Sequence, residues 1–461
     1  MISSGGKKTP EKETAGLRWR GIVEGFYYEM WSHAGRLRTL GFMHGAGFDS
    51  YIYAPKADPH HRDRWREAYP AADRRRFREL VRAADGSGIE FFWAISPGLT
   101  IRYSGRKDFN ILLGRMLEMA RLGVSSFGLF LDDIPEKLSE ADKKFGGLAH
   151  AQVDVTNRIY KELTSRTEVK SFLFCPTEYW GLKATPHLET LGRGLEREIG
   201  IFWTGEHVVS PVVTGEHATK IGAVLRRRPV LWDNYPVNDY NRRKLNMGPL
   251  MGRDAELPRR LEGYFANPMN EEMCSRLPLL TIGDYLRDPE GYDPAASWER
   301  AARRAGGRKR AALRRVADVL RPGIFPDEPL PAVVSAIKDF ERSEKTGAAK
   351  RRGKKLLREL SALREAAGKL PGALDGVMAR EMRPHLKQIR LAAAAAECAV
   401  KARLAGVGAR EEFLRDGEKL LRKAKKVGMV VYAGAIEAFA ERTLVFDAKQ
   451  QGKTGKDTIK T

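Results

Sequence analysis

Ser126-Phe-Gly-Leu-Phe-Leu-Asp-Asp-Ile-Pro135 contains a short apolar run that ends in two adjacent carboxylates, Asp132 and Asp133. An apolar run that does not alternate with polar residues is typical of a parallel strand covered on both faces. Similar runs recur along the chain between Leu17 and Pro294. The eight runs are Gly21–Tyr27, Ser50–Lys56, Glu90–Pro97, Ser126–Asp133, Lys170–Tyr179, Gly200–Gly205, Pro229–Asn234 and Leu261–Pro268.

Helical patterns separate these runs. Apolar residues recur at helical spacing in Arg74–Ala84, Ile111–Leu122, Gln152–Leu163 and Thr219–Leu225. Eight strand–helix units in about 280 residues match a (β/α)8 TIM barrel in length and order. A doubly wound open sheet is the competing layout. The sequence therefore predicts an α/β domain, with the barrel as the favoured architecture.

The composition changes after Pro294, where Ala, Leu, Lys, Arg and Glu dominate. Helical segments are expected at Trp298–Leu320, Ala332–Lys345, Lys354–Leu370, Val377–Leu404 and Arg410–Phe446. We therefore expect a disordered N-terminal segment (1–16), a catalytic barrel (17–293), a basic all-α helical bundle domain (294–449) and a disordered tail (450–461).

The formal net charge of +22 is unevenly distributed. Residues 294–461 contain 38 Lys and Arg against 20 Asp and Glu, whereas the preceding residues contain 43 against 39. The basic runs Lys350–Lys355 and Arg422–Lys426 are typical of solvated helix faces, and few aromatic residues are interleaved with them. A nucleic-acid partner is therefore not favoured, and we expect instead a helical domain that flanks the barrel or mediates homodimerisation.

The cysteine content and the lack of long apolar runs indicate the cellular compartment expected for the protein. Three scattered cysteines, Cys175, Cys274 and Cys398, are too few for a disulfide framework or a metal cluster. No apolar run approaches the roughly 20 residues of a membrane-spanning helix, and the N-terminus lacks the pattern of a secretory signal. These features favour a cytoplasmic protein without a membrane partner.

Polar or unusual residues occur where nearly every predicted strand ends. They are Glu24, Gly25, Lys56, Ser96, Asp132, Asp133, Glu178, Tyr179, Thr204, Asn234 and Asn267. In a barrel, these ends converge on the face where active sites are built. Strand ends also meet solvent and are often polar for that reason, but solvent exposure explains a Lys, a Tyr and several Asn less well.

The adjacent carboxylates Asp132 and Asp133 carry the strongest chemical signal. Two like charges this close disfavour simultaneous ionisation, so one pKa is expected to be raised, as glycosidic acid catalysis needs. The pair also fits a cap of the following helix or a Mg²⁺ site. A metal site would need further carboxylates at the other strand ends, where Asn, Lys and Tyr predominate.

Together, the motifs at the strand ends resemble glycoside hydrolase family 84, which contains protein O-GlcNAcases and hyaluronidase-like bacterial β-N-acetylglucosaminidases. The matching stretches are Arg20–Tyr27, Tyr53–Lys56, His61–Arg66, Ala94–Gly98, Leu131–Ile134, Ala149–Gln152, Phe174–Tyr179, Trp203–Gly205, Trp232–Asn234, Asn238–Tyr240 and Ala266–Pro268. They keep the order of the family and cover roughly residues 20–294.

The resemblance implies a retaining exo-β-N-acetylglucosaminidase with substrate-assisted catalysis, in which the 2-acetamido oxygen of the sugar attacks and an oxazoline forms. Asp132 corresponds to the residue that polarises the acetamido N–H, and Asp133 to the general acid/base. Further residues correspond to those that bind the sugar: Gly25, Lys56, Tyr179, Trp232, Asn234, Asp239 and Asn267. The resemblance implies no cofactor or metal, and a GlcNAc-bearing glycan or glycoprotein as substrate.

One stretch departs from the family. After Gly-Phe-Tyr the family usually has Gly, closely followed by Pro-Trp, whereas this chain has Tyr28-Glu29-Met30-Trp31. The approach of the aglycone is therefore expected to differ. An endo-acting hydrolase of a GlcNAc-containing polysaccharide such as hyaluronan, and a sugar-binding module without turnover, remain alternatives to the exo-acting enzyme.

Overall fold

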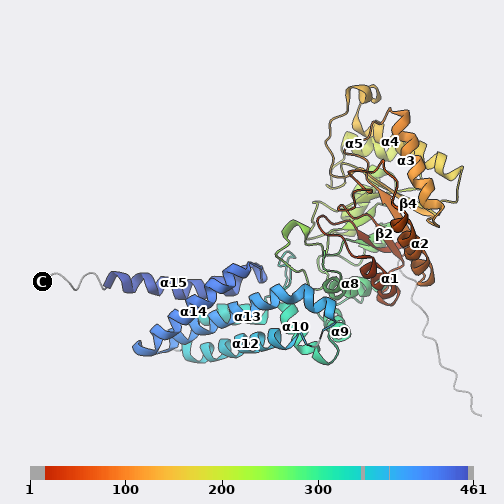
Figure 1. Ribbon diagram of the computed structural model, residues 1–461. Coiled ribbons are helices and arrows are strands. Elements are labelled where there is room, and N and C mark those ends of the chain that lie inside the picture. The colour runs from red at the N-terminus through yellow and green to blue at the C-terminus, as the bar shows by residue number, and fades with distance from the viewer. Residues whose placement is uncertain (1–15, 344–347, 373, 455–461) are drawn as a thin grey trace, which may run out of the picture. The chain divides into compact units, whose positions relative to one another are not determined.

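The computed structural model describes residues 16–343, 348–372 and 374–454 (Figure 1). Internal contacts divide the chain into two compact units. The first contains residues up to Tyr235 together with Gly252–Pro268 and Ile282–Asp293, and the second contains Pro236–Met251, Met269–Thr281 and the residues from Pro294 onward. The domain boundary at Pro294 remains our proposal, since two segments before it group with the second unit.

Eight parallel strands form a closed barrel in the first unit. The strands are β1 (Trp19–Glu24), β2 (Ser50–Tyr53), β3 (Glu90–Ile95), β4 (Ser126–Phe130), β5 (Ser171–Cys175), β6 (Ile199–Trp203), β7 (Val230–Asp233) and β8 (Gly263–Ala266). Strand β1 pairs with both β2 and β8, which closes the sheet and excludes the open layout. The predicted (β/α)8 barrel is confirmed.

Helices follow the strands and lie outside them (Figure 1). They are α1 (His33–Ala46), α2 (Ala71–Gly86), α3 (Arg106–Ala120), α4 (Leu148–Thr164), α5 (Pro186–Gly194), α6 (Gly215–Leu225), α7 (Leu257–Arg260) and α8 (Glu272–Arg287). Three of them begin at a side-chain cap, since the hydroxyls of Ser32, Thr185 and Thr214 accept backbone N–H groups of the first turn. These caps set where the chain leaves the loop and enters the helix.

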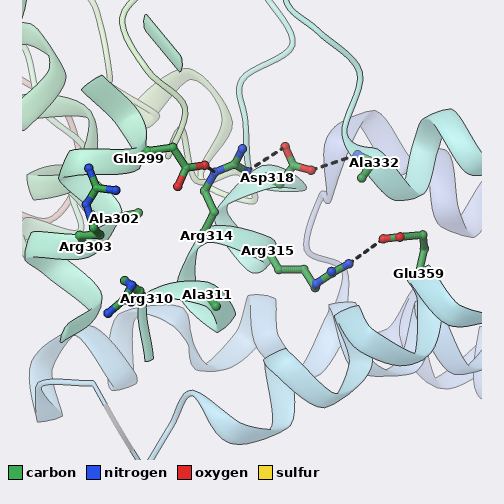
Figure 2. Close-up of a pocket in the computed structure, with 10 residues that line it drawn as sticks. All are labelled: Glu299, Ala302, Arg303, Arg310, Ala311, Arg314, Arg315, Asp318, Ala332 and Glu359. Carbon is green, nitrogen blue, oxygen red and sulfur yellow. Dashed lines mark hydrogen bonds and ion pairs between the residues drawn. The ribbon is translucent and has the colours of Figure 1, made fainter. Parts of the chain in front are cut away.

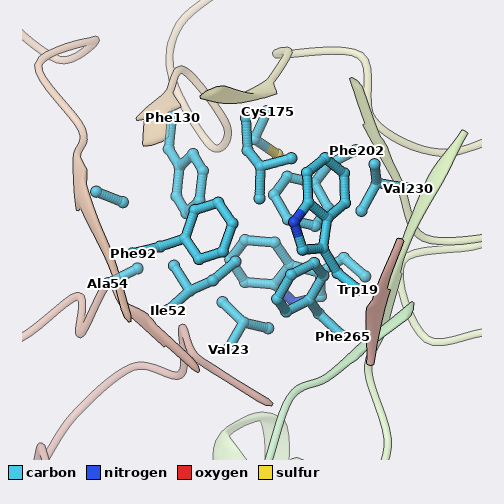
Figure 3. Close-up of a cluster of buried hydrophobic side chains, with 13 residues drawn as sticks. Trp19, Val23, Ile52, Ala54, Phe92, Phe130, Cys175, Phe202, Val230 and Phe265 are labelled. Atoms are coloured by element: carbon cyan, nitrogen blue, oxygen red, sulfur yellow. The ribbon is translucent and has the colours of Figure 1, made fainter. Parts of the chain in front are cut away.

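Aromatic side chains fill the interior of the barrel (Figure 3). Phe202 contacts Phe130, Trp232 and Phe265 edge-on, with ring centroids 5.3–5.7 Å apart. This is the favoured geometry for aromatic pairs. Gly21 makes room for this packing, because a Cβ atom there would lie 2.2 Å from the Phe265 ring. The large rings therefore require a glycine on the neighbouring strand.

A buried ion pair joins the first strand to the first helix. The guanidinium of Arg36 donates to both carboxylate oxygens of Glu24, at 2.7 and 2.8 Å. Both side chains are buried, and Glu24 also accepts from the Trp31 backbone N–H and the Tyr51 hydroxyl. Glu24 is one of the polar strand ends noted in the sequence. Its contacts give it a structural role rather than a place in the site.

The second unit is helical beyond residue 294, which confirms the predicted C-terminal helical region. Its helices there are α9 (Pro294–Gly306), α10 (Arg310–Asp318), α11 (Ala332–Ser343), α12 (Ala349–Lys369), α13 (Gly376–Leu404), α14 (Val407–Val427) and α15 (Ala435–Thr454). The expected single segment Arg410–Phe446 is two helices. Gly428, at φ 74°, ends α14 in the left-handed conformation that favours glycine.

Two predictions concern the ends of the chain. The expected disordered N-terminal segment lies outside the described residues, except for Gly16. Of the expected disordered tail, residues 450–454 belong to α15, which continues to Thr454, and residues 455–461 lie outside the described residues. Within the described ranges, none of the helices is both long and apolar enough to span a bilayer.

We predict that Arg36→Met destabilises the barrel by about 3–5 kcal/mol, because it leaves the Glu24 carboxylate buried without its charged partner. Chemical denaturation would measure the change in the free energy of unfolding. Arg82→Met, at an exposed position on α2, is the matched control and should change it by no more than about 0.5 kcal/mol. A loss below about 1 kcal/mol for Arg36→Met would contradict the structural role of the pair.

Candidate active site

Asp132 lies two residues after β4, at the carboxyl end of the barrel. Its side chain is buried, and Oδ2 accepts from the Lys56 ammonium at 2.5 Å. Lys56 is also buried and follows β2, so the ion pair joins two strand ends. The second oxygen, Oδ1, is buried and has no hydrogen-bond partner in the described part of the chain. Asp132 therefore presents one carboxylate oxygen that a ligand N–H could satisfy.

Asp133 has different surroundings, although it is adjacent in sequence. It is exposed, and its two carboxylate oxygens accept from the phenols of Tyr27 and Tyr179, each at 2.7 Å. Burial, together with the charge and hydrogen bond of Asp133, raises the pKa of both phenols above the ordinary range. Both tyrosines therefore remain protonated donors. The two aspartates thus differ in burial and in hydrogen-bond partners.

The backbone of Asp133 is strained, with φ at 50°. A non-glycine residue in the left-handed region costs roughly 1–2 kcal/mol. Arg62 offsets part of this cost, because its Nη2 donates to the Asp133 carbonyl at 2.8 Å while its Nη1 donates to Ser96 Oγ at 3.3 Å. Arg62 is itself buried. It therefore fixes the turn that carries the carboxylate.

Trp232 and Gly25 form a tightly packed part of the site. A Cβ atom on Gly25 would lie 2.2 Å from the Trp232 indole, so only glycine fits beside this ring. Trp232 is 5% exposed, and its Nε1 donates to Asn234 Oδ1 at 3.1 Å. The Lys56 ammonium lies 6.0 Å from the centre of the ring. The indole therefore lies beside the ion pair of the site.

Asn234 and Asn267 bring two adjacent strand ends together. Asn267 donates from Nδ2 to Asn234 Oδ1 at 2.9 Å, and its backbone N–H donates to the carbonyl of Asp233 at 2.8 Å. Asn234 Nδ2 donates to the Val208 carbonyl at 2.7 Å. The side-chain oxygen of Asn267 is buried without a partner among the described residues. It is a second acceptor that a ligand donor could satisfy.

The predicted site residues thus divide into two groups. The first unit brings together Gly25, Lys56, Asp132, Asp133, Tyr179, Trp232, Asn234 and Asn267 through the contacts above. Asp239 belongs to the second unit, where it begins a short 3-10 helix, Asp239–Asn241. Its role as a sugar ligand stays a prediction.

Sequence reasoning did not assign roles to Tyr27 and Arg62, although both occur in the stretches that resemble the family. Tyr27 follows the end of β1 by three residues, which was a usable signal. The role of Arg62 depends on a contact with a backbone carbonyl 71 residues away, and a single sequence gives no sign of it.

His61 and Cys175 are residue types that can bind metals, but each is buried among protein groups. His61 is buried and contacts the Ala94 carbonyl through Nδ1 at 2.9 Å. Burial and the nearby Lys56 charge lower its pKa to about 3, so it is neutral. Burial also raises the pKa of the Cys175 thiol, which packs in the barrel core. Within residues 16–343, 348–372 and 374–454, no three His, Cys, Asp or Glu side chains group as metal ligands would.

The atypical loop after β1 has a defined conformation. Tyr28 occupies the position where the family usually has Gly, and it adopts φ 68°. Its side chain is 63% exposed and that of Met30 is 45% exposed. Trp31 instead packs on Phe26, with ring centroids 5.6 Å apart. The unusual side chains therefore point towards solvent rather than into the core.

Comparisons with known proteins identify the family of the chain. The profile of the β-N-acetylglucosaminidase (NAGidase) family matches residues 20–318. Protein O-GlcNAcases of Rattus norvegicus and Mus musculus are each 38% identical over 274 residues, which is 58% of this chain but 30% of those proteins. The chain therefore spans less than a third of the curated relatives it matches.

A solved structure extends the likeness to most of the chain. A mutant of the Thermobaculum terrenum O-GlcNAc hydrolase superposes with a TM-score of 0.86 and 30% identity, over 95% of this chain and 97% of that one. The chain belongs to the β-N-acetylglucosaminidase family, glycoside hydrolase family 84.

Proposed function

We propose that the protein is a retaining exo-β-N-acetylglucosaminidase that uses the 2-acetamido group of its substrate as the nucleophile. One observation carries the proposal: two adjacent aspartates have different surroundings. Asp132 has a buried Oδ1 atom without a hydrogen-bond partner among the described residues, whereas the Asp133 carboxylate accepts hydrogen bonds from two phenols. The first group suits an amide N–H that becomes more acidic. The second suits proton transfer at an exposed position.

In the first step, the acetamido oxygen attacks the anomeric carbon and the bond to the leaving oxygen breaks. Asp133 donates its carboxyl proton to the leaving oxygen, while Asp132 Oδ1 accepts the acetamido N–H and stabilises the positive charge that develops there. Lys56 fixes the other oxygen of Asp132, so the acceptor is already oriented. The product of this step is an oxazoline.

In the second step, water attacks the anomeric carbon of the oxazoline from the face that the leaving group vacated, and the bond between that carbon and the acetamido oxygen breaks, which restores the acetamido group. Asp133, now a carboxylate, removes a proton from this water and regains its original state. Two inversions restore the original anomeric configuration, so the reaction is retaining. Tyr27 and Tyr179 contact the two oxygens of the Asp133 carboxyl group and so hold its position.

The rest of the site supports sugar recognition. The unpartnered oxygen of Asn267 would accept a sugar hydroxyl, and Asn234 orients it. Asp239 of the second unit is proposed as a further hydroxyl ligand. Buried polar groups that need a partner reject sugars lacking the matching hydroxyl. The Trp232 indole and Gly25 restrict the shape of the pocket beside these groups.

We propose O-GlcNAc-modified protein as the natural substrate, on the strength of the names of the relatives. The alternatives are endo-acting hydrolysis of a GlcNAc-containing polysaccharide and sugar binding without turnover. Release of GlcNAc from an aryl β-GlcNAc glycoside and from a modified peptide, with no shortening of hyaluronan, would support the exo-acting enzyme. Shortening of the polymer, or binding without turnover, would replace it with one of the alternatives.

We predict that Asp133→Ala slows hydrolysis of a substrate with a poor leaving group by about 10²–10⁴-fold. An activated aryl glycoside should suffer less in its first step, because its leaving oxygen needs little protonation. Steady-state kinetics on both substrates measures the difference. Asp85→Ala, at an exposed position on α2, is the control and should leave both rates unchanged. Equal slowing of the two substrates would rule out acid catalysis by Asp133.

We predict that kcat/KM falls steeply when one, two or three fluorines are placed on the N-acetyl group. Fluorine withdraws electron density from the attacking oxygen, whereas a carboxylate nucleophile would make the rate nearly insensitive to it. Asp132→Asn should lower the rate and flatten the dependence, because a neutral amide stabilises the positive charge less well. Tyr179→Phe should have a smaller effect. If kcat/KM of the unaltered enzyme did not change along the fluorinated series, this result would contradict the substrate-assisted mechanism.

We predict that the basic helical region has a structural role and forms a homodimer. The apolar stripe of α12 is buried within the chain, at Leu356, Leu360 and Leu363, and its opposite face is charged, which supports a packing role for this helix. Sedimentation should detect a dimer, and immobilised heparin or DNA should not retain the protein at physiological salt. Tight retention that falls steeply with the logarithm of salt concentration would favour a nucleic-acid partner.

A further inference from the structure

Two cavities away from the catalytic residues are rich in arginine, and they differ in charge balance. The first, of about 420 Å³, lies among α9, α10 and α12 (Figure 2). Arg314 contacts Glu299 at 2.5 Å and Arg315 contacts Glu359 at 2.6 Å. Four arginines face three carboxylates there, so the charges are nearly balanced within the protein. This cavity gives no reason to infer a ligand.

The second cavity is a groove of about 830 Å³ between α2 and α3 of the barrel unit. Its charged lining consists of six arginines and one carboxylate, and its other lining residues are small or apolar. We call it the arginine groove; its charged residues are Arg66, Arg74, Arg75, Arg78, Arg115, Arg121 and Glu118. None of the described residues that line it is aromatic.

The positive charge of the arginine groove is mostly uncompensated. Arg66 is neutralised by Asp108 at 2.7 Å. Glu118 serves two arginines, Arg74 at 3.5 Å and Arg115 at 3.2 Å. The guanidinium groups of the remaining three, Arg75, Arg78 and Arg121, make no ion pair or hydrogen bond with any residue the structure describes. Four positive charges are therefore left without a counter-charge in one groove.

Arg115 adds a second reason to expect an anion. Its side chain is 4% exposed, and its Nε and Nη2 atoms have no hydrogen-bond partner among the described residues. The guanidinium lies 4.6 Å from the centre of the Tyr69 ring, and burial lowers its pKa. A buried cation with a shared carboxylate is costly. Negative charge in the groove would offset that cost.

Gly114 leaves space on the α3 side of the groove. A Cβ atom built at this position meets nothing within 4 Å, so packing does not require a glycine here. Glycine inside a helix costs roughly 0.5–1 kcal/mol relative to alanine. Gly114 thus lowers the stability of α3, but the absence of a side chain leaves space in the groove. A ligand that occupies this space would explain why a glycine is present.

We propose that the arginine groove binds a small molecule that carries a chain of phosphate groups. Guanidinium groups bind phosphate oxygens through paired hydrogen bonds. A phosphate group carries up to about two charges, so a triphosphate matches the four uncompensated charges better than carboxylates with one charge each. The groove has the size of a small-molecule site, and the absence of lining aromatic residues disfavours single-stranded nucleic acid.

Titration calorimetry of the full chain with inorganic tripolyphosphate at physiological salt tests the proposal. We expect saturable binding at one site, weakened at least about tenfold by Arg75→Ala and by Arg121→Ala, since each removes a charged hydrogen-bond donor. Arg76→Ala is the matched control. Arg76 is on the same helix but outside the groove, paired with Asp73, and its replacement should change binding by less than about twofold.

A second pair of variants tests whether the ligand needs the open space of the groove as well as its positive charge. Gly114→Leu should fill the groove and weaken binding at least about tenfold, although every arginine remains. Gly41→Leu, on α1 at another glycine with open space, is its control and should leave binding unchanged. Thermal unfolding of each variant verifies that the barrel is folded.

Several results would overturn the proposal. They are the absence of saturable tripolyphosphate binding, equal weakening by Arg76→Ala, and binding of citrate as tight as that of tripolyphosphate. Binding of a heparin oligosaccharide or an oligonucleotide without binding of tripolyphosphate would instead identify a surface for polymers. None of the substituted residues contacts the catalytic aspartates, so these outcomes are independent of the hydrolase proposed above.

Discussion

The ion pair between Lys56 and Asp132 is the interaction on which the candidate site depends. Both side chains are buried at the carboxyl end of the barrel, where two unpaired charges would be very unfavourable. Each charge is therefore tolerated only because the other is present. The pair also joins the ends of β2 and β4, so it aligns two strands that are not neighbours in the sheet. One free acceptor on Asp132 is left for a ligand.

Side chains of the candidate site pack directly on side chains of the barrel core. A substitution in one of them is therefore expected to affect the packing of the other. Trp232 packs edge-on against Phe130 and Phe202 below, and beside it only glycine fits at residue 25. Phe130 immediately precedes the chain segment that carries the aspartates. A change in core packing would therefore move the indole and the catalytic strand end together. The rigidity of the aromatic core is in this sense part of the geometry of the candidate site.

The sequence predicted the strands well because parallel strands covered on both faces are nearly continuous apolar runs. All eight predicted runs overlap a strand, although most of the strands end two to four residues before the predicted limit. Most of the predicted site residues consequently lie in loops after the strands, although Trp232 lies within β7 and Asp239 begins a 3-10 helix. The burial of Lys56 and Asp132 and the left-handed turn at Asp133 depend on contacts between distant segments, and no local pattern encodes such contacts. The same holds for the grouping of Asp239 with the second unit.

Net charge is a poor guide to where anions would bind. The sequence before Pro294 is nearly neutral, yet it contains the arginine groove, whereas the strongly basic region after Pro294 has a cavity whose arginines are matched by carboxylates. The difference lies in pairing. Three of the six arginines of the groove lie on α2, whereas Glu118, the one carboxylate among the described residues that line it, lies on α3, so only the folded arrangement reveals the shortage of negative charge. Uncompensated charge confined within a small volume, rather than total charge, is what distinguishes a site from a basic surface.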